Sequence, residues 1–114
     1  MKKEELQSCK LTIAELHSFF ERSVKLFLPE TENVEMLEKI VENELKRSAV
    51  IAARAQKYLR LDQVEKATLD VMQRMENVEN SFKLYGKRNP TLLDCRFDYV
   101  HINKYKDWRA KYLA

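Results

Sequence analysis

The sequence predicts an all-α protein that folds as an antiparallel up-down four-helix bundle. Its 114 residues include one glycine and two prolines, and a fold rich in β-strands needs many more turn residues than that. Apolar residues recur every three or four positions along most of the chain, which is typical of helices with one buried face. The expected connections are short, and short connections place successive helices antiparallel. A chain of this length forms one domain, so we expect residues 1–114 to be a single helical domain.

The first expected helix covers residues 3–28, and it carries one continuous apolar stripe. Pro29 ends it, because the residue before a proline avoids the α conformation. An alternative start lies at Thr12, which forms the spacing of a capping box with Glu15. In that alternative, residues 3–11 are a separate turn or arm. The stripe consists of Leu6, Cys9, Ile13, Leu16, Phe20, Val24 and Phe27.

The second expected helix, residues 33–60, is the one around which we expect the others to pack. Its middle, from Ser48 to Ala55, is small or apolar around most of the helix circumference. A helix of that kind is usually covered on two or more sides. Acidic residues dominate its first half and basic residues its second half, an arrangement that complements the helix dipole.

The third expected helix follows a tight junction at residues 61–65. Asp62 is its expected N-cap, and Glu65 completes a capping box. Gly86, the only glycine, lies just past the last apolar position, so we expect it to form a left-handed C-terminal cap. The predicted buried stripe consists of Val64, Ala67, Val71, Met75, Val78 and Phe82, widened by Thr68, Met72 and Tyr85.

The fourth expected helix covers residues 92–113. Residues 95–99 alternate in hydropathy, which leaves a strand as an alternative for that short stretch. The up-down topology places Cys9 near one end of the bundle and Cys95 near the other. A disulfide needs Cα atoms within about 7 Å, so we expect no bond between these two cysteines.

Several classes of function lack the residues they require. No apolar run reaches the roughly 18 residues of a membrane span, and two cysteines are too few for a disulfide framework or a zinc site. The sequence contains no glycine-rich phosphate loop, no His-Glu-x-x-His pair and no nucleophile elbow. His17 borders the first apolar stripe, where an edge residue is the simplest interpretation. We therefore predict no cofactor, no metal site, no catalytic residue and no membrane partner, in a cytoplasmic protein.

The C-terminal third carries the candidate binding residues. From residue 82 to residue 114 there are eight bases and three acids, a local charge of +5. Seven aromatic residues fall in the same stretch, too many for one buried face of one helix. Tyr, Trp and Arg are common anchors of protein interfaces, and bases mixed with aromatics also suit single-stranded nucleic acid. The predicted binding residues are Tyr99, Lys104, Tyr105, Lys106, Trp108, Arg109, Lys111 and Tyr112.

One motif in this stretch suggests an alternative chemistry. Arg96 and His101 are separated by four residues, a spacing that resembles the motif of the HEPN superfamily, many of whose members are all-α ribonucleases or nucleotide-binding bundles that dimerise to form the active site. The resemblance implies that Arg96 stabilises phosphate charge and that His101 moves the proton of the attacking ribose hydroxyl. It covers six residues, and Phe97 stands where the family commonly has a polar residue.

The sequence thus favours a small non-enzymatic helical protein that binds another macromolecule, in the first place a protein. An adaptor, a regulator, an inhibitor and an assembly subunit all fit this description. A homodimer is a further hypothesis, because three neighbours in a short chain leave part of an apolar second helix uncovered. The alternative is a nucleic-acid-binding helical module. In a catalytic version of this alternative, the module is a HEPN-like ribonuclease that uses Arg96 and His101.

Overall fold

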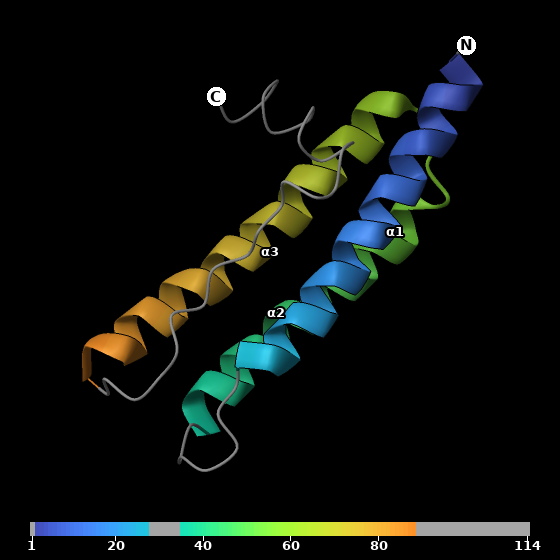
Figure 1. Ribbon diagram of the computed structural model, residues 1–114. Coiled ribbons are helices and arrows are strands. Elements are labelled where there is room, and N and C mark those ends of the chain that lie inside the picture. The colour runs from blue at the N-terminus through green and yellow to red at the C-terminus, as the bar shows by residue number, and fades with distance from the viewer. Residues whose placement is uncertain (1, 28–34, 89–114) are drawn as a thin grey trace.

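The computed structural model describes residues 2–27 and 35–88, which form three helices and contain no strand (Figure 1). Successive helices run antiparallel, and each of the three packs against the other two. The predicted all-α fold is confirmed over these ranges. The fourth helix, predicted for residues 92–113, lies outside the described residues, so the four-helix bundle remains a prediction. The helices are α1 (Lys2–Phe27), α2 (Glu35–Ala55) and α3 (Leu61–Arg88).

The core is built from the apolar stripes of all three helices. Phe20 of α1, Leu37 of α2 and Phe82 of α3 are among its largest fully buried side chains. Each such side chain stabilises the fold by about 1.5–3 kcal/mol relative to exposure. The stripes predicted for the first and third helices are confirmed where side chains are described. Buried residues from these stripes are Cys9, Ile13, Leu16, Phe20 and Val24 on α1, and Val64, Ala67, Val71, Met75, Val78 and Phe82 on α3.

Helix α1 is continuous through Thr12, so the alternative of a separate arm at residues 3–11 is wrong. Thr12 is buried, and its Oγ1 donates a hydrogen bond to the carbonyl oxygen of Ser8 at 2.9 Å. That bond runs back by one helical turn, as threonine hydroxyls do inside helices, whereas an N-cap hydroxyl accepts from the amides that follow it.

Helix α2 is not the central, surrounded helix that its sequence predicted. Val50 is 47% exposed, and Ala49 and Ala53 are exposed as well. One side of the helix is buried, so α2, like α1 and α3, contributes one face to a shared core. Alanine is the best helix former and buries little area, so a run of alanines is equally compatible with a solvent-facing surface. The buried residues of α2 are Leu37, Val41, Ser48, Ala52 and Ala55.

The connection between α2 and α3 begins earlier than predicted, because α2 ends at Ala55 and not near Arg60. The backbone N–H groups of residues 56–58 donate to the carbonyls three residues before them, at 3.0–3.3 Å, which tightens the last turn of the helix. Gln56 then caps this end with its side chain. Its Nε2 donates to the carbonyl of Ala52 at 3.3 Å and to that of Lys10 in α1 at 3.0 Å.

The N-terminus of α3 also differs from the prediction. The helix begins at Leu61, so Asp62 belongs to its first turn and is not the N-cap. The Asp62 carboxylate accepts two hydrogen bonds from the Arg60 guanidinium, from Nε at 3.0 Å and from Nη2 at 2.7 Å. An acid in the first turn stabilises the helix through its dipole. Asp62 therefore still stabilises this end of α3, through its charge and not as an N-cap.

The predicted cap at Gly86 is wrong. Helix α3 continues through Gly86 to Arg88, and this glycine has no positive φ angle. A glycine that ends a helix by the left-handed route must have one. Gly86 therefore occupies an ordinary helical position, where glycine is about 1 kcal/mol less favourable than alanine.

None of the three described helices is long and apolar enough to cross a membrane.

Candidate binding site at the α2–α3 turn

The binding residues predicted from the sequence lie outside the described residues. The same holds for Arg96 and His101, so the interface, nucleic-acid and ribonuclease interpretations of this segment stay predictions. The predicted binding residues in question are Tyr99, Lys104, Tyr105, Lys106, Trp108, Arg109, Lys111 and Tyr112.

Within the described residues, two hollows flank the turn that joins α2 to α3. This turn lies at the end of the bundle where α1 begins (Figure 1). The Leu59 groove has a volume of about 470 Å³ and is lined by Glu5, Leu6, Leu59, Arg60, Leu61, Asp62 and Glu65. The Tyr58 pocket has a volume of about 320 Å³ and is lined by Ile51, Arg54, Tyr58, Gln63, Lys66, Ala67 and Asp70.

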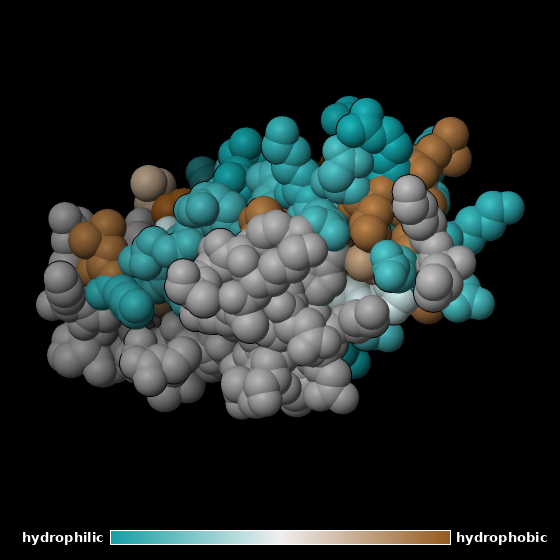
Figure 2. Space-filling view, turned by 90° about the horizontal axis from the view of Figure 1, so that it is seen from above, coloured by the Kyte–Doolittle hydropathy of each residue, from teal (hydrophilic) through white to brown (hydrophobic). Residues whose placement is uncertain are grey.

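The Leu59 groove combines an exposed apolar tip with a packed apolar base. Leu59 is 86% exposed, the highest value among the large apolar side chains of the described ranges. Leu6 and Leu61 are half-buried and pack on a small core formed by Cys9 and Val64. Figure 2 shows apolar surface at this same end of the molecule, at the right of the view. Leu59 thus projects into solvent from a base that is already supported.

The rim of the Leu59 groove is acidic. Glu5, Asp62 and Glu65 line it together with a single base, Arg60. The hydrogen bond from the Arg60 side chain holds the pKa of Asp62 below its usual value. Desolvation, the next largest effect, opposes it, and the charge of Arg60 and the backbone amides of Asp62 and Gln63 add to the lowering. Asp62 therefore stays ionised, and the groove presents three negative groups and one positive group around apolar side chains.

The origin of this acidity is local to the helices. Glu5 lies in the first turn of α1, and Asp62 lies in the first turn of α3. Acidic side chains stabilise helix N-termini by about 0.3–1 kcal/mol. Because the antiparallel topology brings both of these N-termini to one end of the bundle, their first-turn acids meet at the same groove.

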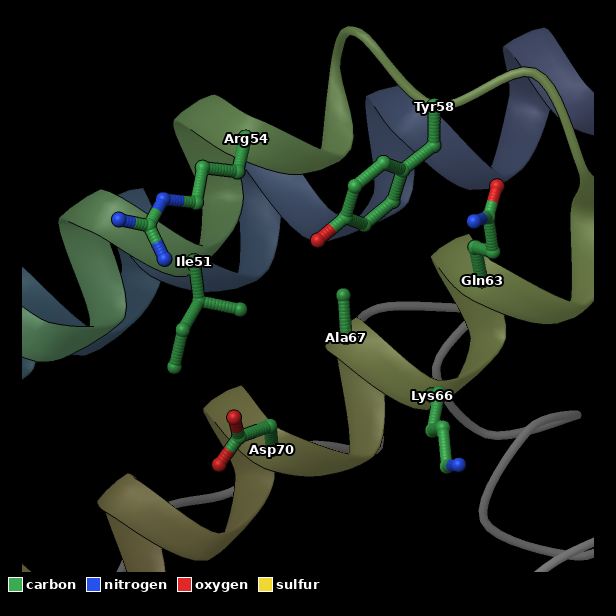
Figure 3. A pocket seen from close by; sticks show the side chains of 7 residues that line it. All are labelled: Ile51, Arg54, Tyr58, Gln63, Lys66, Ala67 and Asp70. Atoms are coloured by element: carbon green, nitrogen blue, oxygen red, sulfur yellow. The ribbon is translucent and has the colours of Figure 1, made fainter.

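The Tyr58 pocket is a shallow recess between α2 and α3 (Figure 3). Ile51 and Ala67 form its apolar wall, and the Tyr58 hydroxyl points into the gap between the two helices. The charged ends of Arg54 and Lys66 point in different directions. The polar groups therefore do not converge on one point, as they would in a site that holds an anion.

A Ser–His–acid contact in the body of the bundle has the residue types of a hydrolase triad. The Ser48 Oγ lies 2.7 Å from Nδ1 of His17, and Nε2 of His17 lies 3.6 Å from Oε2 of Glu21. Ser48 is fully buried in the middle of α2, so a substrate cannot reach its hydroxyl. The amides around it belong to a helix and are not free to act as an oxyanion hole. This contact joins α1 to α2, and His17 is the stripe-edge residue that the sequence predicted.

No group of three or more His, Cys, Asp or Glu side chains suited to a metal ion occurs in residues 2–27 and 35–88.

Leu59 is the site residue that sequence reasoning missed. The predicted second helix ran to residue 60, and Leu59 falls four residues after the buried Ala55, so it continued the apolar stripe of that helix. Asp62 was the available signal. If Asp62 belongs to the first turn of the next helix, the residues just before it must form the connection, and an apolar side chain there is exposed.

Comparison with known proteins supplies no family for this chain. No family model matches the sequence, no curated protein matches it, and no solved structure matches the model.

Proposed function

We propose that this chain is a non-enzymatic helical protein that binds another protein, and that the Leu59 groove is part of the binding surface. The observation that carries the proposal is the 86% exposure of Leu59 beside the half-buried Leu6 and Leu61. Single exposed apolar residues are common on protein surfaces. An exposed leucine at a turn, with a hollow of apolar base and charged rim beside it, has the anatomy of an interface centre.

The shape of the groove favours a macromolecular partner over a small molecule. A small-molecule site usually buries most of its ligand and offers a few convergent polar groups. Here Leu59, the most exposed large apolar side chain of residues 2–27 and 35–88, lies in solvent at the turn, so it can enter a partner's surface. An apolar side chain that projects in this way contributes most when a partner covers it completely, because water is then excluded from the contact.

The C-terminal segment supplies the second part of the proposal. Its predicted binding residues combine rings and bases, and Trp108 and Tyr105 are the anchors that we expect to matter most for a protein partner. Truncation of Trp108 to alanine should weaken binding by about 2 kcal/mol or more. A cytoplasmic location and the absence of a membrane partner likewise remain predictions from the sequence.

The test compares partner capture by three forms of the full chain. We expect Leu59→Asp to lower the affinity for the captured protein at least tenfold, because the substitution places a charge where an apolar contact forms. A tenfold loss of affinity corresponds to about 1.4 kcal/mol. Leu84→Asp is the matched control, since Leu84 is a 55% exposed leucine near the other end of α3. Equal capture by all three forms would contradict the role of the groove.

Nucleic-acid binding is the second candidate, and the local charge of +5 in residues 82–114 favours it. Nuclease treatment of the capture sample separates the two candidates, because a nucleic-acid partner is lost and a protein partner is retained. Nucleic-acid affinity should also fall steeply with salt, in proportion to the phosphates contacted. If the HEPN resemblance extends to activity, His101→Ala should abolish RNA cleavage and leave the fold intact.

A further inference from the structure

We infer that the solvent-facing side of α2 is the interface of a two-fold symmetric homodimer, in which two copies of α2 pack antiparallel. This side lies opposite the buried residues of the helix, so neither α1 nor α3 covers it. We call it the outer face of α2. It consists of the exposed residues Met36, Lys39, Asn43, Lys46, Val50 and Ala53.

The outer face has the spacing of a helix that packs on another helix. Its residues form two series with a period of seven, one from Met36 to Val50 and one from Lys39 to Ala53. Seven residues are close to two helical turns, so each series follows one line along the helix, as the contact positions of a coiled coil do. Met36 is 63% exposed and Val50 is 47% exposed. One of the two lines therefore presents large apolar side chains that a second helix can cover.

The charges beside the outer face are sorted along the helix. Glu35 and Glu38 lie exposed in its first turn, and Arg54 and Lys57 lie exposed at and just past its end. Within residues 2–27 and 35–88 none of these four side chains forms an ion pair. The helix dipole favours bases only within the last turn, whereas the basic half already includes Arg47, about two turns before Ala55. The dipole therefore explains only part of the sorting.

A two-fold axis beside residue 45 makes the sorted charges complementary. At 1.5 Å per residue, it brings Glu35 and Glu38 of one copy to within about 3 Å of the level of Arg54 in the second copy. Met36 of one copy arrives close to the level of Ala53, whose short side chain leaves room for it. A parallel pair would set acids against acids and bases against bases. Opposite charges fix the direction and register of such a contact more than they add affinity.

The lysines of the outer face are compatible with this contact. Lys46 lies nearest the axis, but its Nζ is 3.0 Å from Oε1 of Glu42 in the same helix, so its charge is compensated where the two copies meet. Lys39 lies at the level of Val50 of the second copy. A lysine stem packs on apolar surface while its ammonium group stays in water, so the exposed valine can be covered without burying a charge.

The pairing has a consequence for partner binding, and only this consequence rests on the proposed function of the Leu59 groove. Leu59 lies past the end of α2, so the antiparallel dimer places its two Leu59 grooves at opposite ends. At the helical rise they are roughly 40 Å apart. A partner that carries two matching segments with a suitable linker then binds with higher avidity than one segment alone.

Light scattering after gel filtration at micromolar concentration tests the dimer. The parent protein should have about twice the chain mass of 13.6 kDa. Val50→Asp should have the mass of one chain, because the substitution places one charge from each copy in the contact. Leu11→Asp is the matched control, since Leu11 is 55% exposed within α1, and it should remain a dimer. Far-ultraviolet circular dichroism verifies that both variants are folded.

Charge reversal tests the antiparallel direction. Arg54→Glu with Lys57→Glu makes both ends of the helix acidic, and Glu35→Lys with Glu38→Lys makes both ends basic. Each of these double variants should be a monomer by itself, because its like charges meet in the pair. An equimolar mixture of the two should form a dimer, because both contacts are again between opposite charges.

Three outcomes would overturn the inference: a monomeric parent protein, the same mass for Val50→Asp and Leu11→Asp, or a mixture of the two charge variants that stays monomeric. Leu59→Asp separates this inference from the proposed function. It should lose partner capture and keep the mass of the dimer. A monomeric Leu59→Asp would place the contact between copies at the groove and not on α2.

Discussion

The charged residues Glu44 and Arg74 face each other across the contact between α2 and α3. Oε2 of Glu44 and Nε of Arg74 lie 3.4 Å apart, and both side chains are 12% exposed. Among the described residues neither atom has a hydrogen-bond partner, so their opposite charges compensate each other. Asp70 lies 3.7 Å from the same Arg74 nitrogen. Removal of one partner from such a pair leaves a largely buried charge without compensation.

We predict that Arg74→Ala lowers the free energy of unfolding by about 3 kcal/mol, the lower end of the range for breaking a buried ion pair. The double variant Glu44→Leu with Arg74→Met should recover most of that loss, because apolar residues of similar volume often replace buried pairs without cost. Urea unfolding measures both. A loss below about 0.5 kcal/mol for Arg74→Ala would show that the pair is no more than a surface contact.

The contribution of Asp62 to stability depends on pH. Its pKa is held below the usual value of 3.8, chiefly by the Arg60 hydrogen bond. A carboxyl group whose pKa is lowered by folding stabilises the protein above the unfolded pKa, and this contribution disappears as the pH falls through the folded pKa. The difference in Tm between the parent and Asp62→Asn should therefore be constant from pH 7 to about pH 5 and shrink below pH 3.8. An unchanged difference at pH 3 would contradict this assignment.

At the scale of single helices, the C-terminal ends of α2 and α3 do not follow the intrinsic helix preferences of their residues. Helix α2 ends at Ala55 with a side-chain cap from Gln56, although no proline or glycine stops it there. Helix α3 passes through the only glycine of the chain. Intrinsic preference is about 1 kcal/mol per residue at most for such choices, so packing of the helix on its neighbours overrides it.

For helix α3 we predict that Gly86→Ala raises the free energy of unfolding by about 0.5–1 kcal/mol. The reason is that Gly86 lies in a helix without a positive φ angle, so alanine fits and loses less conformational freedom on folding. Thermal unfolding measures the effect. A clear drop in Tm would instead indicate the left-handed conformation that the sequence suggested.

At the scale of the whole molecule, the topology brings the parts of the candidate binding site together. It brings the first turns of α1 and α3 and the α2–α3 turn to one end, where Leu59 lies exposed (Figure 1). The single domain over residues 1–114 and the homodimer remain predictions. Light scattering after gel filtration decides the homodimer, and the HEPN alternative requires one because its active site is shared.

Helix content tests the four-helix bundle. The described helices hold 26, 21 and 28 residues, or 75 of the 114. Circular dichroism of a molecule with these helices alone should give about two thirds helix, and a fourth helix over residues 92–113 should raise this to about 85%. We expect the higher value, and a value near two thirds would reject the fourth helix.

The sequence by itself determined the helical class and the buried faces of α1 and α3. Residues such as Ile13, Phe20, Val71 and Met75 are buried as predicted. Apolar residues with helical spacing all lie on one face of the helix, and that face is the one that packs against the other helices. The spacing of apolar residues within a single helix is enough to predict its buried face.

Only the tertiary structure decided where α2 ends, that Ser48 meets His17, and that Leu59 is exposed beside an acidic groove. These features depend on neighbours distant in sequence: the Gln56 side chain that caps α2 through the Ala52 carbonyl also donates to the Lys10 carbonyl of α1. Small residues such as Ala49 fit a buried or an exposed position equally well, so the pattern alone could not place them. The candidate site was missed for the same reason, since a groove forms where separate helices meet and no single stretch of sequence contains it.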